Sequence, residues 1–236
     1  MIVIAHRGVS AEAPENTVAA FDRAIALGCD AIETDIQASR DGVLVLIHDE
    51  RVDRTTDGQG AVADRTFSEL RALDAGSWKD RRFAGQQIPT LDEFLDRYVP
   101  RIPAYLEIKA PGVELASLQA VRRRGLLDRV VFTSFHFESV KLIAESAPVR
   151  ACWTIRSWTS ETRERAKTAP LHEVSINVRN VTADTAAGVR AAGLGVRCWG
   201  LADEDLMRRA TAAAVDGVTI DFPEKLLRYL GRPVPS

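Results

Sequence analysis

Strand-like and helix-like stretches alternate along almost the whole 236-residue chain. The first kind are short apolar or β-branched runs, and the second kind carry apolar residues at helical spacing. The strand-like runs lie at residues 2–5, 31–36, 104–109, 130–135, 150–155, 173–178, 196–199 and 217–222. Eight β/α units in a chain of this length predict an α/β protein with a closed (β/α)8 barrel, the TIM barrel. An open doubly wound sheet is the alternative, but no G-x-G-x-x-G sequence follows the first strand to favour it.

A hairpin interrupts this alternation after the second strand. A turn centred near Arg40 is followed by a second strand-like run at residues 43–47, which predicts an antiparallel pair. In that register Glu33 lies opposite Ile47, and His48 arrives at the level of the Glu33 carboxylate. The hairpin therefore predicts that His48 lies close to the acidic residues of the second strand.

Residues 51–87 follow the hairpin and show little periodicity, with many Arg, Asp and Gly residues. A stretch this long inside a compact domain is usually functional or contains small elements of its own. No linker or internal repeat divides the rest of the chain. We therefore expect a single domain over residues 1–236, with a small insertion at about 51–87.

Composition and charge indicate the compartment of the protein and which classes of partner the chain has no general attraction for. A formal charge of -2 gives no general attraction to nucleic acid or acidic membranes. Residues 1–8 lack the basic leader and long apolar run of a signal peptide, and no stretch is long enough to cross a bilayer. The three cysteines, Cys29, Cys152 and Cys198, lie scattered in apolar runs and fit reduced core positions. We therefore expect a cytoplasmic protein with no nucleic-acid partner and no stable membrane association.

Three acidic residues indicate a metal site. Glu33 and Asp35 share one face of the second strand, and Glu107 faces inward from the strand at 104–109. Polar residues near the C-terminal ends of barrel strands lie at the active-site end of the barrel. Neighbouring buried carboxylates repel each other, and a hard cation such as Mg²⁺ or Ca²⁺ would relieve that repulsion. The alternatives are a solvated edge strand for the first two residues and an internal ion pair between Glu107 and Lys109.

Two histidines are expected at the same end of the barrel. His6 ends the first strand, and His48 follows the return strand of the hairpin. Imidazole titrates near working pH, so such a pair can act as a general base and a general acid. Arg7 can bind an anionic group if the first strand ends before it; the alternative for Arg7 is a surface ion pair. With a metal ion, these groups predict cleavage of a phosphate ester.

Short motifs, in order from Ile2 to about Pro223, are similar to those of the glycerophosphodiester phosphodiesterase family. They are His6-Arg7-Gly8, Pro14-Glu15-Asn16-Thr17, Glu33-Thr34-Asp35, Asp41-Gly42, His48-Asp49, Asp53-Arg54-Thr55-Thr56, Ile88-Pro89-Thr90-Leu91, Glu107-Ile108-Lys109, Ser134-Phe135 and the closing stretch from Gly217 through Asp221 to Pro223. The resemblance implies a TIM barrel with an insertion after the second strand. It also implies the roles of individual residues: metal ligands Glu33, Asp35 and Glu107, an acid/base pair of His6 and His48, and phosphate-binding residues Arg7 and Lys109.

The chain departs from the family pattern near the seventh strand. The family often has Trp-Thr-Val-Asn there, whereas this chain has Trp199-Gly200-Leu201-Ala202. Trp199 either contacts the glycerol or head group of the substrate or packs in the core. Arg197 shares a face with Trp199 and is either a further cation near the barrel mouth or part of a buried structural pair. His136 is a further candidate for the mouth, and His172, at the start of a strand, is expected to be structural.

The resemblance implies a metal-dependent hydrolase that cuts glycerophosphodiesters, which are small molecules, to glycerol 3-phosphate and an alcohol. One alternative is a lysophospholipase D-type reaction on lysophospholipids, which requires an apolar groove for the acyl chain. Another is a non-catalytic barrel that binds sugar phosphates. The sequence leaves open the native cation, the preferred alcohol, which histidine is the acid, the choice between a direct and a cyclic-phosphate route, and the oligomeric state.

Overall fold

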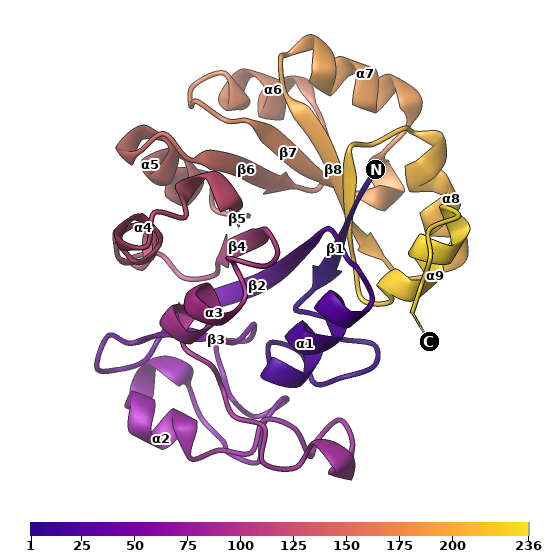
Figure 1. Ribbon diagram of the computed structural model, residues 1–236. Helices are drawn as coiled ribbons and strands as arrows, with labels where there is room; N and C mark the ends of the chain where they lie inside the picture. The colour runs from indigo at the N-terminus through magenta and orange to yellow at the C-terminus, as the bar shows by residue number, and fades with distance from the viewer. Residues whose placement is uncertain (236) are drawn as a thin grey trace.

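The computed structural model describes residues 1–235, and eight parallel strands in it close into a barrel (Figure 1). The strands are β1 (Ile2–His6), β2 (Ala31–Ala38), β4 (Ala104–Ile108), β5 (Val130–Ser134), β6 (Arg150–Ile155), β7 (Glu173–Asn177), β8 (Gly195–Leu201) and β9 (Gly217–Ile220). Closure is shown by β1, which pairs with β2 on one side and with β9 on the other. The TIM barrel expected from the sequence is therefore confirmed, and the open sheet is excluded.

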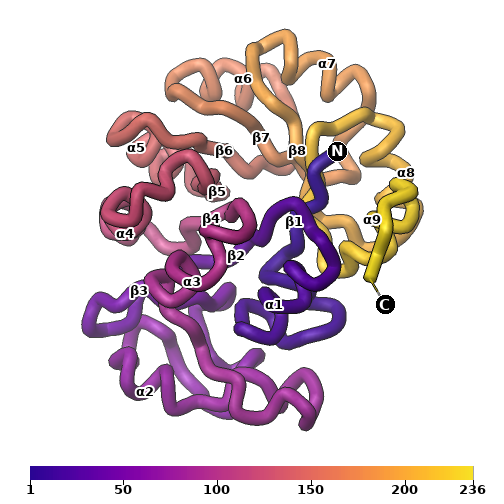
Figure 2. The backbone as a smooth tube through the Cα atoms, viewed as in Figure 1, coloured from indigo at the N-terminus to yellow at the C-terminus, as the bar shows by residue number. Residues whose placement is uncertain are grey.

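Helices surround the barrel, with one following most of the parallel strands (Figure 2). They are α1 (Val18–Ala26), α2 (Phe67–Arg71), α3 (Leu91–Arg97), α4 (Glu114–Arg123), α5 (Phe137–Ser146), α6 (Ser160–Ala166), α7 (Ala183–Ala191), α8 (Glu204–Ala212) and α9 (Pro223–Tyr229), with short 3-10 turns η1 (Val62–Asp64), η2 (Arg81–Phe83), η3 (Leu127–Arg129) and η4 (Val178–Asn180). Helix α1 begins after Thr17, whose side chain accepts a hydrogen bond from the Ala20 amide, and it ends just before Gly28, which has a φ of 73°. In the described residues no helix is long and apolar enough to span a membrane.

The alternation of side chains along each strand separates two regions of the fold. On β4, Ala104, Leu106 and Ile108 belong to the main core between the barrel and its helices. Tyr105 points the other way, into a small apolar cluster inside the barrel, and Glu107 lies further along the same face. The inward direction predicted for Glu107 is therefore confirmed. Cys29, Cys152 and Cys198 are buried and free, as their apolar surroundings predict.

The hairpin after β2 forms, but its predicted register is wrong by two residues. Strand β3 (Leu44–Leu46) pairs with β2 so that Ile36 opposes Leu46, and the Ile47 amide donates a hydrogen bond to the Asp35 carbonyl (3.1 Å) instead of lying opposite Glu33. The turn centres on Asp41, because the Asp41 carboxylate accepts hydrogen bonds from the Ser39 hydroxyl (2.7 Å) and from the Phe67 amide (2.8 Å). Contacts with the insertion, which the hairpin sequence alone does not reveal, therefore help to fix the turn.

The insertion at about 51–87 carries η1, α2 and η2 and packs beside β3 and α1 (Figure 1). It has a small apolar cluster of its own with the β3 region, formed by Val45, Ile47, Val52, Val62, Leu70, Ala75 and Ile88. Capping stabilises its helix, because the Thr66 side chain and the Glu69 side chain satisfy each other's backbone amides. The small elements expected in this stretch are thus present.

Candidate active site

Three carboxylates meet inside the barrel, two from the middle of β2 and one from near the C-terminal end of β4. Asp35 pairs with Glu107 in the strand register, and Glu33 lies two residues earlier on the same face as Asp35. One oxygen from each of the three residues lies within 4.8 Å of the other two. Glu33 and Asp35 are 3% and 1% exposed, yet Glu33 Oε1 and Asp35 Oδ1 have no hydrogen-bond partner among residues 1–235. Buried acceptors left without a donor are costly, so this cluster has the character of an ion site.

The charges of these carboxylates are strongly coupled. Burial and the neighbouring charge of Asp35 raise the pKa of Glu33 to about 8, and the same two causes raise the pKa of Glu107. Burial also acts to raise the pKa of Asp35, but the nearby Arg7, His48 and Lys109 outweigh burial and lower that pKa below its ordinary value. Without a further positive charge, the three groups therefore resist full ionisation. Oxygen donors of this kind fit a hard divalent cation, which would allow all three to ionise.

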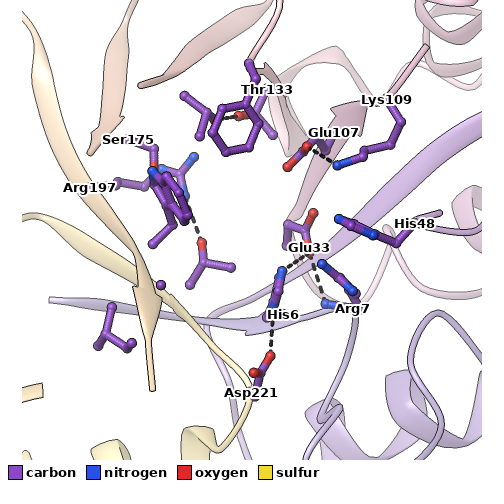
Figure 3. Close-up of a pocket in the computed structure, with 16 residues that line it drawn as sticks. His6, Arg7, Glu33, His48, Glu107, Lys109, Thr133, Ser175, Arg197 and Asp221 are labelled. Atoms are coloured by element: carbon purple, nitrogen blue, oxygen red, sulfur yellow. Dashed lines mark hydrogen bonds and ion pairs between the residues drawn. The ribbon is translucent and has the colours of Figure 1, made fainter. Parts of the chain in front are cut away.

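His6 ends β1 beside this cluster and is oriented by Asp221, the residue that directly follows the last strand. Its Nδ1 lies 2.5 Å from Asp221 Oδ1, and the Ser10 hydroxyl donates to the same oxygen (2.8 Å). The other ring nitrogen, Nε2, lies 4.0 Å from Glu33 Oε2. Burial lowers the pKa of His6, but the hydrogen bond to Asp221 and the charge of Glu33 outweigh burial and raise it overall. The imidazole is thus fixed at Nδ1, while Nε2 faces the carboxylates (Figure 3).

His48 reaches the same cavity from the loop after β3. The Gln37 amide group on β2 donates to the carbonyls of Ile47 (3.3 Å), His48 (3.0 Å) and Asp49 (2.6 Å), and so fixes the backbone of this loop. The His48 ring is held in turn, because its Nδ1 lies 2.6 Å from Asp49 Oδ1. His48 and Glu33 line one cavity, so the predicted proximity is confirmed despite the different register.

Two cations lie beside the carboxylates, and Arg7 turns toward them because β1 ends at His6. Arg7 has a φ of 56°, a left-handed conformation that redirects its side chain from the outer face expected by strand alternation. Its guanidinium contacts Glu15 Oε1 (2.7 Å) and Asp35 Oδ2 (3.3 Å). Lys109 follows β4, and its Nζ lies 2.9 Å from Glu107 Oε1 and 3.9 Å from Asp35 Oδ1. Both cations line the cavity.

The cavity that these groups surround has a volume of about 280 Å³. It is lined by His6, Arg7, Glu33, His48, Glu107, Lys109, Thr133, Phe135, Thr154, Ser175, Arg197, Trp199, Gly200, Leu201, Thr219 and Asp221. Figure 3 shows the ionisable groups on and just after β1, β2 and β4 on one side of the cavity, with Ser175 and Arg197 across from them and Thr133 next to Glu107. This size suits a small ligand, because pockets for drug-sized molecules span roughly 300–1,000 Å³.

Four hydroxyl side chains line the part of the cavity formed by β5, β6, β7 and β9, and we call them the hydroxyl floor: Thr133, Thr154, Ser175 and Thr219. Arg197 lies among them as a buried ion pair, with its Nε 3.2 Å from Glu173 Oε2 and its Nη1 donating to the Thr219 hydroxyl (3.1 Å). Of the two roles open for Arg197, the buried pair is present, and the residue also lines the cavity. The floor is therefore polar and carries no net charge.

Trp199 lines the cavity wall, where its indole nitrogen donates a hydrogen bond to the Ile155 carbonyl (2.9 Å). Its ring and that of Phe135 pack edge to face, with 5.1 Å between their centroids. His136 is exposed and does not line the cavity. His172 precedes β7 at the opposite end, where its Nδ1 accepts a hydrogen bond from the Ala151 amide (3.4 Å). Trp199 is thus placed to contact a ligand, whereas the two histidines are not.

The sequence did not predict a functional role for several residues of the site. Asp221 and Asp49 each hold a histidine, and the four residues of the hydroxyl floor line part of the cavity. Asp221 directly follows β9, and polar residues just after barrel strands are a usable signal. The floor carries no such signal, because isolated Thr and Ser residues inside strands are common in any sheet.

The chain is similar in sequence and in structure to proteins of one family. Residues 6–225 match the Glycerophosphoryl diester phosphodiesterase family. A glycerophosphodiester phosphodiesterase of Caldanaerobacter subterraneus is 37% identical over 241 residues, which cover 97% of each chain. A crystal structure of glycerophosphodiester phosphodiesterase from Agrobacterium tumefaciens is 31% identical with a TM-score of 0.85, covering 97% of this chain and 99% of that one. A phosphodiesterase of Oleispira antarctica, solved with the product sn-glycerol-3-phosphate, is 30% identical with a TM-score of 0.87, covering 98% of this chain and 97% of that one.

Proposed function

This chain belongs to the glycerophosphoryl diester phosphodiesterase family, and we propose that it hydrolyses glycerophosphodiesters to glycerol 3-phosphate and an alcohol in the cavity at the barrel mouth. One observation carries the proposal: two imidazoles and two cations surround a single cavity together with a cluster of buried carboxylates. Phosphodiester cleavage needs this combination, because negative charge must be neutralised while protons move at two oxygens.

A divalent cation is proposed to bind between Glu33, Asp35 and Glu107. The support is the orphaned buried oxygens of Glu33 and Asp35 and the spacing of the three carboxylates. Oxygen-only donors favour Mg²⁺ or Ca²⁺ over softer metals. When bound, such an ion supplies Lewis-acid polarisation of a phosphoryl oxygen.

The protein's own cations are proposed to hold the phosphate group. Arg7 and Lys109 both line the cavity, and each contacts a carboxylate, Glu15 for Arg7 and Glu107 for Lys109. Arg7 can grip two phosphoryl oxygens with its planar guanidinium, and Lys109 adds a point charge. Both would stabilise the charge that builds on the phosphoryl oxygens.

His6 and His48 are proposed to move the protons. One removes a proton from the attacking oxygen, of water or of the neighbouring substrate hydroxyl, and the other donates a proton to the departing alcohol. Each Nδ1 is engaged with an aspartate, Asp221 for His6 and Asp49 for His48. Proton transfer with the substrate is therefore assigned to Nε2 of each ring.

The hydroxyl floor favours a glycerophosphodiester over a lysophospholipid as substrate. Hydroxyl side chains can both donate and accept hydrogen bonds, so they match the free hydroxyls of an unacylated glycerol group. Arg197 adds no net charge there, because Glu173 neutralises it. An acyl chain in place of a glycerol hydroxyl would meet this polar surface, which makes the lysophospholipid reaction the less favourable assignment.

Incubation with glycerophosphocholine and either Mg²⁺ or Ca²⁺, with and without EDTA, tests the proposal. We expect release of glycerol 3-phosphate and choline that EDTA abolishes, and little turnover of lysophosphatidylcholine. His48→Ala should reduce kcat by roughly 10²- to 10⁴-fold, the usual contribution of general acid–base catalysis. His136→Ala is the matched control, because His136 lies outside the cavity lining, and should retain activity. No product from glycerophosphocholine with either ion would refute the proposal, and EDTA-insensitive turnover would remove the metal from it.

A further inference from the structure

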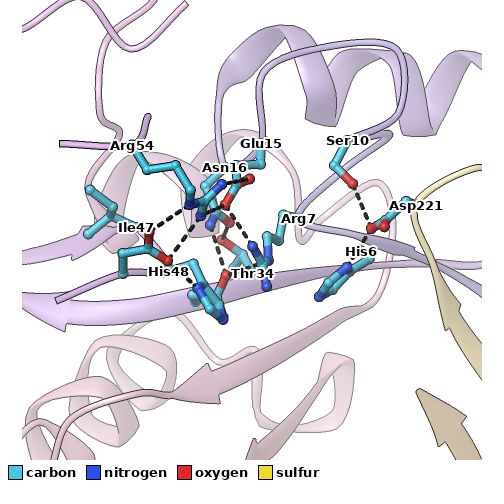
Figure 4. Close-up of polar contacts among 12 residues, drawn as sticks. His6, Arg7, Ser10, Glu15, Asn16, Thr34, Ile47, His48, Arg54 and Asp221 are labelled. Carbon is cyan, nitrogen blue, oxygen red and sulfur yellow. Dashed lines mark hydrogen bonds and ion pairs between the residues drawn. The ribbon is translucent and has the colours of Figure 1, made fainter. Parts of the chain in front are cut away.

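Arg54, near the start of the insertion, binds two carboxylates at once (Figure 4). Its Nη1 and Nη2 donate to the two oxygens of Glu15 (2.7 and 2.8 Å). Its Nε and Nη2 donate to the two oxygens of Asp49 (2.6 and 3.0 Å). A single guanidinium therefore forms two forked ion pairs, an arrangement that fixes the orientation of each carboxylate as well as its distance.

Each of these carboxylates also holds a side chain of the candidate active site. Asp49 Oδ1, which accepts a hydrogen bond from Arg54, is the atom that lies 2.6 Å from His48 Nδ1. Glu15 Oε1, which also accepts from Arg54, receives a hydrogen bond from Arg7 Nη1 (2.7 Å). Arg54 is thus linked to His48 through Asp49 and to Arg7 through Glu15.

We propose that Arg54 is a positioning residue that fixes where the side chains of His48 and Arg7 lie relative to each other. The inference rests on the proposed function, because it assumes that His48 moves a proton and that Arg7 binds phosphate. Asp49 is 30% exposed and Glu15 10%, so without Arg54 the Asp49 carboxylate in particular has room to turn toward solvent. The histidine and the arginine would then lose the groups that orient them. The insertion therefore contributes to the reaction although Arg54 is absent from the cavity lining.

A role in fold stability alone is the competing explanation, and the exposure of Arg54 argues against it. The side chain is 45% exposed, so solvent screens both forked pairs and limits what they add to the stability of the fold. Misplacing a catalytic group by a fraction of its hydrogen-bond length, in contrast, can reduce turnover by up to about 10²-fold. The two explanations therefore predict different ratios of lost activity to lost stability.

Kinetics of Arg54→Ala and Arg54→Lys with glycerophosphocholine, beside the melting temperature of each variant, separate these explanations. For R54A we expect kcat to fall about tenfold or more, because His48 is no longer held in place. We expect KM to rise, because Arg7 is no longer held to bind the phosphate group. The melting temperature should stay close to that of the wild type. R54K should recover only part of the loss, because an ammonium group cannot form both forks. Adding guanidinium ion to R54A should restore part of the activity, since the vacated site is open to solvent.

The matched control is Arg51→Ala in the same loop. Arg51 is 61% exposed and contacts Asp53 (3.0 Å), which holds neither site residue, so R51A should behave as the wild type. A double-mutant cycle with Asp49→Asn identifies the route of the effect. If Arg54 acts on kcat through Asp49, adding R54A to D49N should lower kcat by no more than about twofold further.

Three results would overturn the inference: wild-type kinetics in R54A, multiplication of the two losses of kcat in the double variant, or losses of activity that only follow a lower melting temperature. The failure of the proposed function has a different signature. In that case the wild-type enzyme itself releases no glycerol 3-phosphate, whereas the inference about Arg54 fails against an active wild-type enzyme.

Discussion

His6 Nδ1 lies 2.5 Å from the carboxylate of Asp221, although 215 positions separate the two residues in the sequence. The contact exists because the barrel closes: β1 pairs with β9, so the end of the first strand and the residue after the last strand are neighbours. Barrel closure therefore completes the orientation of one proposed catalytic histidine.

Asp221→Asn should lower kcat and move one limb of the pH profile. We expect a loss of about 10- to 100-fold, the range seen for carboxylates that orient a metal-bound histidine through its other ring nitrogen. The hydrogen bond to Asp221 and the Asp221 charge both raise the pKa of His6, so their loss lowers that pKa. The limb of kcat/KM against pH that reports His6 should shift to lower pH.

Ser10→Ala is the control for this variant, because it removes one hydrogen bond to Asp221 and leaves the contact between Asp221 and His6 in place. Its pH profile should shift less than that of D221N. An unshifted profile in D221N, with turnover near the wild-type value, would show that Asp221 does not control His6.

Glu107→Gln should weaken binding of the divalent cation, measured by calorimetry with Mg²⁺ and Ca²⁺. The substitution keeps the size of the side chain but removes one of three anionic ligands from the cluster. Glu145→Gln is an exposed control on α5 and should bind the ion as the wild type does. Equal affinity of E107Q and the wild type would exclude Glu107 as a ligand.

The metal-free protein should lose stability as the pH rises. The pKa of Glu33 is raised from about 4.5 to about 8 in the folded state, so between these values the folded chain holds a proton that the unfolded chain has released. Stability then falls with pH, by at most about 1.4 kcal/mol per pH unit for one such group. The raised pKa values of Glu107 and His6 act in the same direction.

Thermal melts from about pH 5 to about pH 8, in EDTA, measure this slope. Glu33→Gln should flatten it, because the amide does not titrate, and a divalent cation should raise the melting temperature of the wild type most at the upper end. Glu145→Gln should keep the wild-type slope. A melting temperature that rises with pH in the metal-free wild type would contradict the raised pKa of Glu33 in the carboxylate cluster.

The fold was predictable from the sequence because its signal is repeated along the chain. Each strand is short, apolar and followed by a helix with one apolar face, so an error at a single element does not change the architecture. The carboxylates and His6 were predictable for the same reason, since strand alternation and the C-terminal ends of parallel strands define where their side chains lie.

The remaining features depend on contacts between segments far apart in sequence. Asp41 binding the Phe67 amide of the insertion helps to fix the hairpin turn, and the orientation of Arg7 depends on a left-handed φ directly after β1. Arg54 illustrates the limit best, because only the structure shows that its partners Glu15 and Asp49 lie on either side of it. Long-range ion pairs of this kind leave no periodic pattern in the sequence.

Ser175→Ala tests whether the hydroxyl floor recognises glycerol. Ser175 is 2% exposed, lines the cavity, and lies between Thr154 and Arg197 in the strand register. Losing one neutral hydrogen bond of about 0.5–1.5 kcal/mol corresponds to a decrease of roughly twofold to tenfold in kcat/KM for glycerophosphocholine. Hydrolysis of bis(p-nitrophenyl) phosphate, which has no glycerol hydroxyls, should be unchanged, and Ser146→Ala on the outer helix α5 should affect neither substrate. Equal losses for both substrates would mean that Ser175 supports the cavity wall and does not recognise the substrate.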